Sequence, residues 1–112
     1  MSELLNKYAD ISNGLVDIFE AVSKDETDNE IGLLLLKSSM NINRLIRQLE
    51  DEQNPLRYSK KQIDAVKEIN SVEFFITMLI NSGSIAEGKS VSVLQDCMRF
   101  RELLMSGQID GG

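Results

Sequence analysis

Two apolar segments govern how this chain folds: Ile31-Gly32-Leu33-Leu34-Leu35-Leu36 and Phe74-Phe75-Ile76-Thr77-Met78-Leu79-Ile80. Each segment is apolar on more than one side when it is wound into a helix of about 3.6 residues per turn. A helix in a bundle needs only one apolar stripe, and a helix that is apolar all round is normally buried all round. We therefore expect both helices to pack within the chain on one side and against a partner on the other.

Apolar residues recur at helical spacing along the whole chain, which predicts four helices and no strand. In the first, residues 3–23, the dipeptide Asn13-Gly14 allows a kink or a break. The predicted inward-facing stripes are Leu4, Tyr8, Ile11, Leu15, Ile18 and Val22; Ile31, Leu35, Ser38, Ile42, Leu45 and Leu49; Ala65, Ile69, Val72, Ile76 and Leu79; and Val93, Cys97, Phe100 and Leu104. The pattern indicates an all-α fold, an antiparallel four-helix bundle.

Capping signals set the expected helix boundaries. Thr27-Asp28-Asn29-Glu30 has the form of a capping box, so the second helix should begin just after Thr27 and run to about Asp51. Ser59-Lys60-Lys61-Gln62 is a second such box and predicts a helix over 60–81, with Pro55 excluding helix before it. The last helix is expected to start near Ser92, after the short turn of Ser84 to Glu87, and to end at Gly107.

Length and composition bound the class of protein. A chain of 112 residues is expected to form one domain, here a helical bundle over residues 1–106 followed by a flexible C-terminal tail over 107–112. The apolar segments are too short to span a membrane, and the N-terminus shows no secretory signal. One cysteine fits a reducing compartment, so we expect a cytoplasmic protein. The net charge of −6 disfavours general nucleic-acid binding.

The second apolar faces predict a surface for a protein partner. Leu33, Leu36 and Met40 lie roughly opposite the stripe of their helix, and a second set does so in the helix over 60–81: Ile63, Phe74 and Met78. The first helix has no comparable back face. Either the first and last helices cover these residues as core, or they meet a second copy or another protein, since large exposed apolar patches are rare on monomers. The sequence leaves both open and favours a homodimer with a heterologous protein partner.

Two groups of cations offer a weaker prediction. Arg57, Lys60 and Lys61 lie where the helix over 60–81 is expected to begin, a place where backbone donors and cations bind anions. The alternative is that Glu50-Asp51-Glu52 neutralises them across the connector. The cations Lys37, Arg44 and Arg47 are equally consistent with an interface and with a solvated helix surface, where Arg47 would pair with Asp51.

Residues for catalysis or metal binding are scarce. Histidine is absent, which removes the commonest general base and metal ligand, so no metal or cofactor is expected. We expect Cys97 to be a buried structural thiol and Glu73 to be a rim residue paired with a cation. The segment from Gly83 to Ser90 matches the letters of a phosphate-binding loop, GxxxxGK[ST], but that motif needs a preceding strand. Residues 74–80 would have to form that strand for the segment to bind phosphate.

The segment Ser84-Ile85-Ala86-Glu87-Gly88 resembles an Ala-Glu-Gly element of small four-helix-bundle proteins encoded within ribosomal RNA intervening sequences. The resemblance covers five residues and the flanks do not follow, so no site is carried over from it. The residues themselves predict a non-enzymatic protein–protein interaction module, such as a small regulator, adaptor or chaperone. The alternative is an anion- or nucleic-acid-binding regulator that uses Arg57, Lys60 and Lys61.

Overall fold

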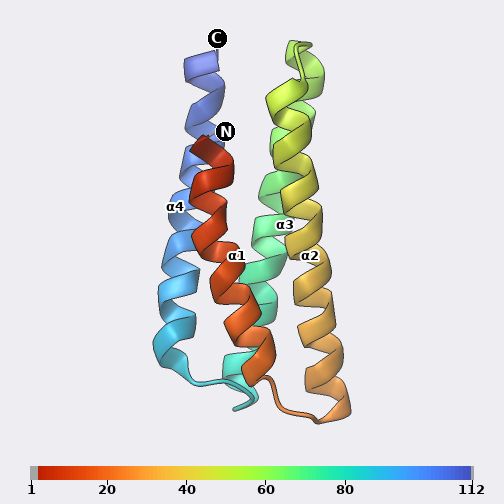
Figure 1. Cartoon of the computed structure of the whole chain (residues 1–112), viewed down its shortest axis with the longest axis vertical. Helices are drawn as coiled ribbons and strands as arrows, with labels where there is room; N and C mark the ends of the chain where they lie inside the picture. Colours follow the sequence, from red (N-terminus) through yellow and green to blue (C-terminus); the bar gives the residue numbers. More distant parts are fainter. Residues whose placement is uncertain (1–2, 112) are drawn as a thin grey trace.

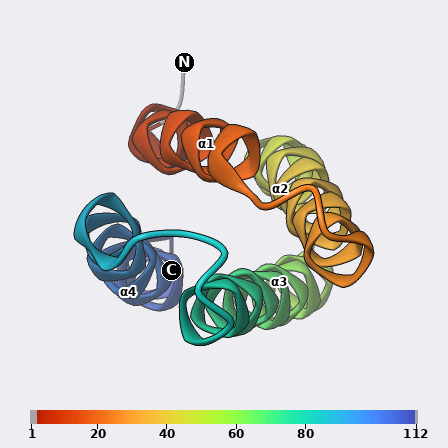
Figure 2. The ribbon, with the colours of Figure 1, turned by 90° about the horizontal axis from the view of Figure 1, so that it is seen from below.

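A computed structural model describes residues 3–111 of the chain, with side chains described for residues 3–106. The described residues form four helices and no strand: α1 (Glu3–Ala21), α2 (Glu26–Asp51), α3 (Pro55–Asn81) and α4 (Glu87–Gly111). Successive helices run in opposite directions, side by side along the long axis of the molecule (Figure 1). Seen from below, they follow one another around a ring (Figure 2). The predicted all-α, four-helix fold is confirmed.

The helices pack as a four-membered ring in which each one contacts its two neighbours. The pairs in contact are α1 with α2, α2 with α3, α3 with α4, and α1 with α4, and the contact between α2 and α3 is the most extensive. The result is a rod of 45 × 22 × 21 Å. Each helix therefore has an outward side that no other helix covers, and the residues on that side can differ from one helix to the next.

The core consists of the stripes that the helical spacing predicts. Every stripe residue is buried except Leu4, which is half-buried against the core. Leu15, Leu35, Ile69 and Cys97, one from each helix, are fully buried. Period and apolar spacing are therefore sufficient to find the inner side of all four helices.

The helix starts differ from those predicted by the capping boxes. α2 is capped by Asp25, whose Oδ2 accepts the backbone N–H groups of Thr27 at 3.2 Å and Asp28 at 3.4 Å, so the prediction that Thr27 is the cap is wrong. α3 is capped in the same way by Asn54, and Pro55 is its first residue. The prediction that Pro55 excludes helix is wrong because the first helical position needs no N–H donor and suits the fixed φ of proline.

Other boundaries also differ from those expected: α1 ends at Ala21, before residue 23, and α4 is longer at both ends. α1 is one unbroken helix through Asn13 and Gly14, without the break that the dipeptide allows. α4 begins at Glu87, about one turn before Ser92, and continues past Gly107 to Gly111. The predicted flexible tail over 107–112 falls on residues whose side chains lie outside the described part of the structure. The chain turns between α3 and α4 at Gly83, whose φ of 78° favours glycine.

Buried polar contacts fix how neighbouring helices are aligned. The Tyr8 hydroxyl of α1 lies 2.6 Å from the Ser39 hydroxyl of α2, and its ring packs on Phe100 of α4 with centroids 5.4 Å apart. Gln62 of α3 donates its amide N–H to the Leu104 carbonyl of α4 at 2.7 Å. Burial raises the pKa of Tyr8 well above its usual range, so this hydroxyl stays protonated. These contacts place α1 beside α2 and α3 beside α4 in a defined register.

Candidate interaction surfaces

The predicted partner-binding residues of α2 lie on the surface of the chain. Leu33 is 52% exposed and Met40 is 72% exposed, while Leu36 is half-buried. On α3, Ile63, Phe74 and Met78 are also exposed, Phe74 at 61%. The packing of α1 and α4 on α2 and α3 does not cover these side chains. The reading in which they form intramolecular core therefore does not describe the single chain.

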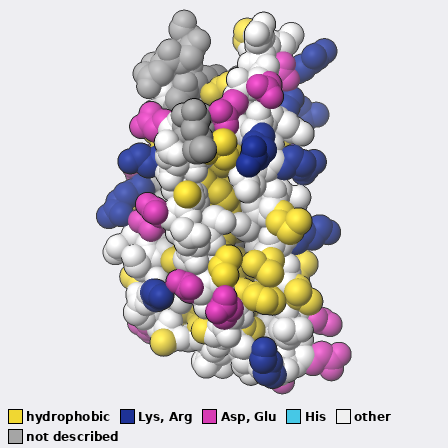
Figure 3. All heavy atoms as spheres, viewed as in Figure 1, with side chains coloured by type: hydrophobic (Ala, Val, Ile, Leu, Met, Phe, Trp, Pro, Cys, Tyr) yellow, Lys and Arg dark blue, Asp and Glu magenta, His cyan; other side chains and the backbone are white. Residues whose placement is uncertain are grey.

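The α2 residues belong to a patch that α1 extends. The Phe19 ring lies 3.2 Å from the position of a Cβ on Gly32, which brings residues 16–19 of α1 alongside residues 32–36 of α2. Val16 is exposed and Phe19 is half-buried. We call Val16, Phe19, Leu33, Leu36 and Met40 the α1/α2 face. Figure 3 shows hydrophobic side chains gathered over the lower parts of α1 and α2.

The contribution of α1 to this face is missing from the sequence prediction, which gave the first helix no second apolar side. Val16 and Phe19 are three residues apart and therefore share one flank of a helix, which is the signal that could have found them. By itself this pair is a weak signal, because two apolar residues on one flank are common on ordinary protein surfaces. Only the position of α2 beside them makes the pair part of a larger patch.

The predicted residues of α3, Ile63, Phe74 and Met78, lie on the exposed side of a helix that is joined to α4 along one flank. Arg101 of α4 donates to Asn70 at 3.1 Å and also to Glu73, which aligns this flank of α3 with α4. Ile63 and Phe74 of α3 and Met98 and Met105 of α4 are all more than half exposed. We call Ile63, Phe74, Met98 and Met105 the α3/α4 face. Exposed apolar side chains thus occur on all four helices, where the sequence singled out the second and third.

The basic cluster is not gathered into one site. Lys61 lies 2.8 Å from the Glu52 carboxylate, and this hydrogen bond, with that of the Asn54 N–H, holds the pKa of Glu52 below its usual range. Arg57 and Lys60 are exposed. The N–H groups of Leu56 and Arg57 at the start of α3 are already capped by Asn54. The prediction that the preceding acidic residues neutralise the cluster is confirmed for Glu52.

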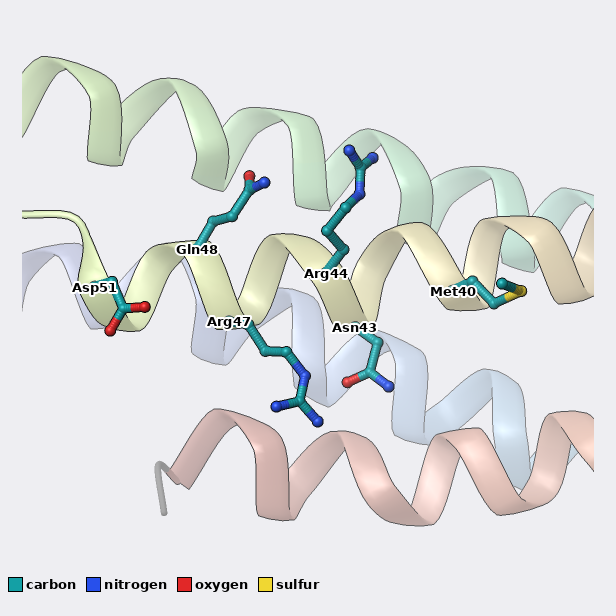
Figure 4. A pocket seen from close by; sticks show the side chains of 6 residues that line it. All are labelled: Met40, Asn43, Arg44, Arg47, Gln48 and Asp51. Carbon is teal, nitrogen blue, oxygen red and sulfur yellow. The ribbon is translucent and has the colours of Figure 1, made fainter.

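A shallow hollow lies on the outer side of α2 (Figure 4). It is lined by Met40, Asn43, Arg44, Arg47, Gln48 and Asp51. Arg44 and Arg47 point to opposite sides of it, and Arg44 donates to Asn41 at 3.4 Å. Among the described residues, Arg47 and Asp51 do not form the ion pair considered for a solvated helix surface. Arg44 and Arg47 are both exposed and line the hollow together with the apolar Met40.

The residues considered for chemistry have structural roles. Cys97 is fully buried, and burial raises the pKa of its thiol to about 12, so it stays protonated at neutral pH. Glu73 accepts a hydrogen bond from Arg101, which confirms the predicted pairing at the rim. The segment before Gly83 is the end of α3, so a helix and not a strand precedes the residues that match the phosphate-binding motif. The lysine of that motif, Lys89, pairs with Asp17 at 3.1 Å. Among the described residues, no three side chains are placed to hold a metal ion.

Comparisons with known proteins give a fold and no family. No helix in the described part of the chain is long and apolar enough to cross a membrane. Neither a protein-family model nor a curated protein matches the sequence. A solved structure from Bacteroides thetaiotaomicron, described as a protein of unknown function from the S23 ribosomal protein family, is 22% identical with a TM-score of 0.81. The match covers 92% of this chain and 95% of that one, and at this identity it shows a shared fold alone.

Proposed function

We propose that this chain is a small non-enzymatic protein–protein interaction module, acting as a regulator, adaptor or chaperone. In this proposal it works in the cytoplasm, where the lone thiol of Cys97 would stay reduced. It associates with a second copy of itself and with a heterologous protein partner. The contacts are made by the α1/α2 face and the α3/α4 face.

One observation carries the proposal: the core is complete without the residues of the two faces. Each helix already fills its inner side with fully buried side chains, such as Leu35 of α2 and Ile76 of α3. Leu33, Met40 and Phe74 add nothing to that core, yet each is large, apolar and more than half exposed. Apolar side chains grouped on one surface are typical of sites that another protein covers.

The alternative, an anion- or nucleic-acid-binding regulator, has less support. Of its three cations, Lys61 is paired with Glu52. The backbone donors at the start of α3 are occupied by Asn54. A net charge of −6 also opposes binding to a polyphosphate. Binding that weakens steeply as salt is added would support this alternative.

The proposal is tested by placing a charge on each face. Phe74→Asp and Met40→Asp should each give a folded, soluble protein with an unchanged circular dichroism spectrum, because both side chains are exposed in the single chain. At least one of them should lose a complex that the wild-type chain makes, measured as mass by light scattering and as capture of protein from the native host. An anchor of this size costs about 2 kcal/mol or more when it is lost from an interface.

The matched control is Ile76→Asp, two residues from Phe74 and fully buried, which should unfold the chain. If Phe74→Asp also unfolds the chain, Phe74 is core and the α3/α4 face does not exist as described. If both surface variants fold and neither changes the mass or any captured protein, the proposed function is wrong.

A further inference from the structure

The outer side of α2 has an order of residues that is complementary to itself. A helical repeat of three and four residues places Glu26, Asn29, Leu33, Leu36, Met40 and Arg47 along this side, with Glu30, Lys37 and Arg44 on its flank. All of these side chains are exposed except Leu36, which is half-buried. We call these nine residues the α2 seam. Along the helix the seam is acidic, then apolar, then basic.

Such an order matches a second copy that runs in the opposite direction. When Leu36 lies next to its own copy at a two-fold axis, Leu33 faces Met40, and Glu26 faces Arg47 of the other copy. On the flank, Glu30 faces Arg44. The apolar residues then lie at the centre and the opposite charges lie at both ends, because a two-fold axis presents every contact twice. In a parallel pair, acids would face acids and bases would face bases.

The neighbouring side chains agree with this arrangement. Val16 and Phe19 continue the apolar centre onto α1, and Glu20 adds an exposed acid beside the acidic end of α2. Figure 3 shows acidic side chains at the lower right, hydrophobic ones in the middle and basic ones above them along the α2 side. Lys37 is the exception: it would lie near its own copy at the axis, with its aliphatic stem over Leu36.

We propose that two copies of this chain pair through the α2 seam in antiparallel orientation, with Leu36 at the two-fold axis and each Glu26–Glu30 end on the Arg44–Arg47 end of the other copy. The proposal rests on the function proposed above and names the occupant of its α1/α2 face. It leaves the α3/α4 face free for a different protein. The pairing is recognised by apolar contact at the centre and by charge at the ends.

Charge reversal tests the orientation. The variant Glu26→Arg with Glu30→Arg should be monomeric by light scattering, and so should Arg44→Glu with Arg47→Glu, each with the dissociation constant of the dimer raised about 100-fold or more. An equal mixture of the two variants should recover a dimer, because opposite charges face each other again at both ends. The matched control is Lys89→Glu with Arg99→Glu on the α1/α4 side, which reverses two cations away from the seam and should leave the dimer intact.

Cysteine cross-linking tests the register. Leu36→Cys should form a disulfide between copies under mild oxidation, since that position lies at the axis, and Arg44→Cys should not. The native Cys97 is fully buried, so it should stay reduced in both variants and should not form a disulfide between copies. Cross-linking at both positions would indicate a parallel pair and overturn the proposal. Cross-linking at neither would show that the seam is not the contact.

The two proposals fail in different ways. A wild-type chain that is monomeric at every concentration overturns the antiparallel pair, while the proposed function survives if Phe74→Asp loses a captured protein. A dimer that persists in all the charge-reversed variants also overturns the antiparallel pair, because it must use another face. Oligomers larger than a dimer that persist in the charge-reversed variants would also overturn the antiparallel pair.

Discussion

The two edges of α1 differ sharply although they belong to one helix. On the α4 side the surface is charged: Lys89 pairs with Asp17, and a hollow is lined by Glu3, Lys7, Asp10, Asp96, Arg99, Phe100 and Leu103. On the α2 side the surface carries Val16, Leu33 and Met40. Both edges close onto the same core, so the core does not require the difference. An edge that water can solvate needs no partner, whereas an apolar edge gains free energy from one.

The two edges also differ in how closely the helices approach at a glycine. A Cβ on Gly14 would lie 2.6 Å from Cγ2 of Val93 in α4, and one on Gly32 would lie 3.2 Å from the Phe19 ring. Val93 is buried and β-branched, so it cannot move aside. Phe19 is half-buried and lies at the border of the apolar face. The α1/α4 edge is therefore tightly closed, while the α1/α2 edge has some freedom to adjust.

The largest expected change in the free energy of unfolding distinguishes a residue on the inner side of α2 from one on its outer side. Leu35→Ala should lower the free energy of unfolding by about 2–5 kcal/mol, because Leu35 is fully buried and leaves a cavity. Leu33→Ala, two residues away, should change it by about 0.5 kcal/mol or less under conditions in which the chain is monomeric. Urea unfolding at low protein concentration measures both. Equal losses would mean that Leu33 is part of the core, which would remove the distinction between the edges.

Gly14→Ala tests how tightly the α1/α4 edge is closed. Overpacking against Val93 costs about 1–3 kcal/mol, and alanine returns about 1 kcal/mol of helix propensity, so the fold should lose stability. Gly32→Ala should cost less, since its nearest neighbour is the edge of a partly exposed ring. Thermal unfolding of the two variants gives the comparison. A stabilised Gly14→Ala would show that the edge is looser than described.

The sequence is enough to find the inner side of this bundle but not its outer organisation. Inner stripes such as Ile11, Leu15 and Ile18 obey the helical period, which depends on local geometry alone. Whether Leu33 and Phe74 share a surface depends instead on the direction in which each helix is turned. That direction follows from contacts between helices, such as Tyr8 with Ser39 and Asn70 with Arg101, which no local pattern encodes.

The helix starts show a second limit of sequence analysis. Asp25 and Asn54 are strong N-cap residues, but the capping boxes at Thr27 and Ser59 offer similar local signals two to five residues later. In the structure, Asp25 and Asn54 accept the first backbone N–H groups of α2 and α3, so both helices begin at the earlier signal. α2 and α3 are joined by only Glu52, Gln53 and Asn54, which a start at Ser59 would have lengthened.

A smaller effect concerns the charged connector between α2 and α3. Because the pKa of Glu52 is lowered by Lys61 and Asn54, the folded chain binds this proton more weakly than the unfolded chain does. The resulting stability is present above the ordinary value of 4.5 and is lost as the pH falls through the lowered pKa. Lys61→Met should weaken this pH dependence, as measured by urea unfolding between neutral and acid pH. An unchanged profile would show that other carboxylates produce it.

The smallest effect is expected at the charged edge itself. In the Lys89–Asp17 pair the side chains are 76% and 50% exposed, so water already solvates both partners. Lys89→Ala should change the free energy of unfolding by about 0.5 kcal/mol or less and should leave the mass in solution unchanged. Met40→Ala, on the apolar edge, should also leave unfolding almost unchanged but should shift the mass toward the monomer. A mass change with Lys89→Ala instead would place the contact between copies on the α1/α4 edge.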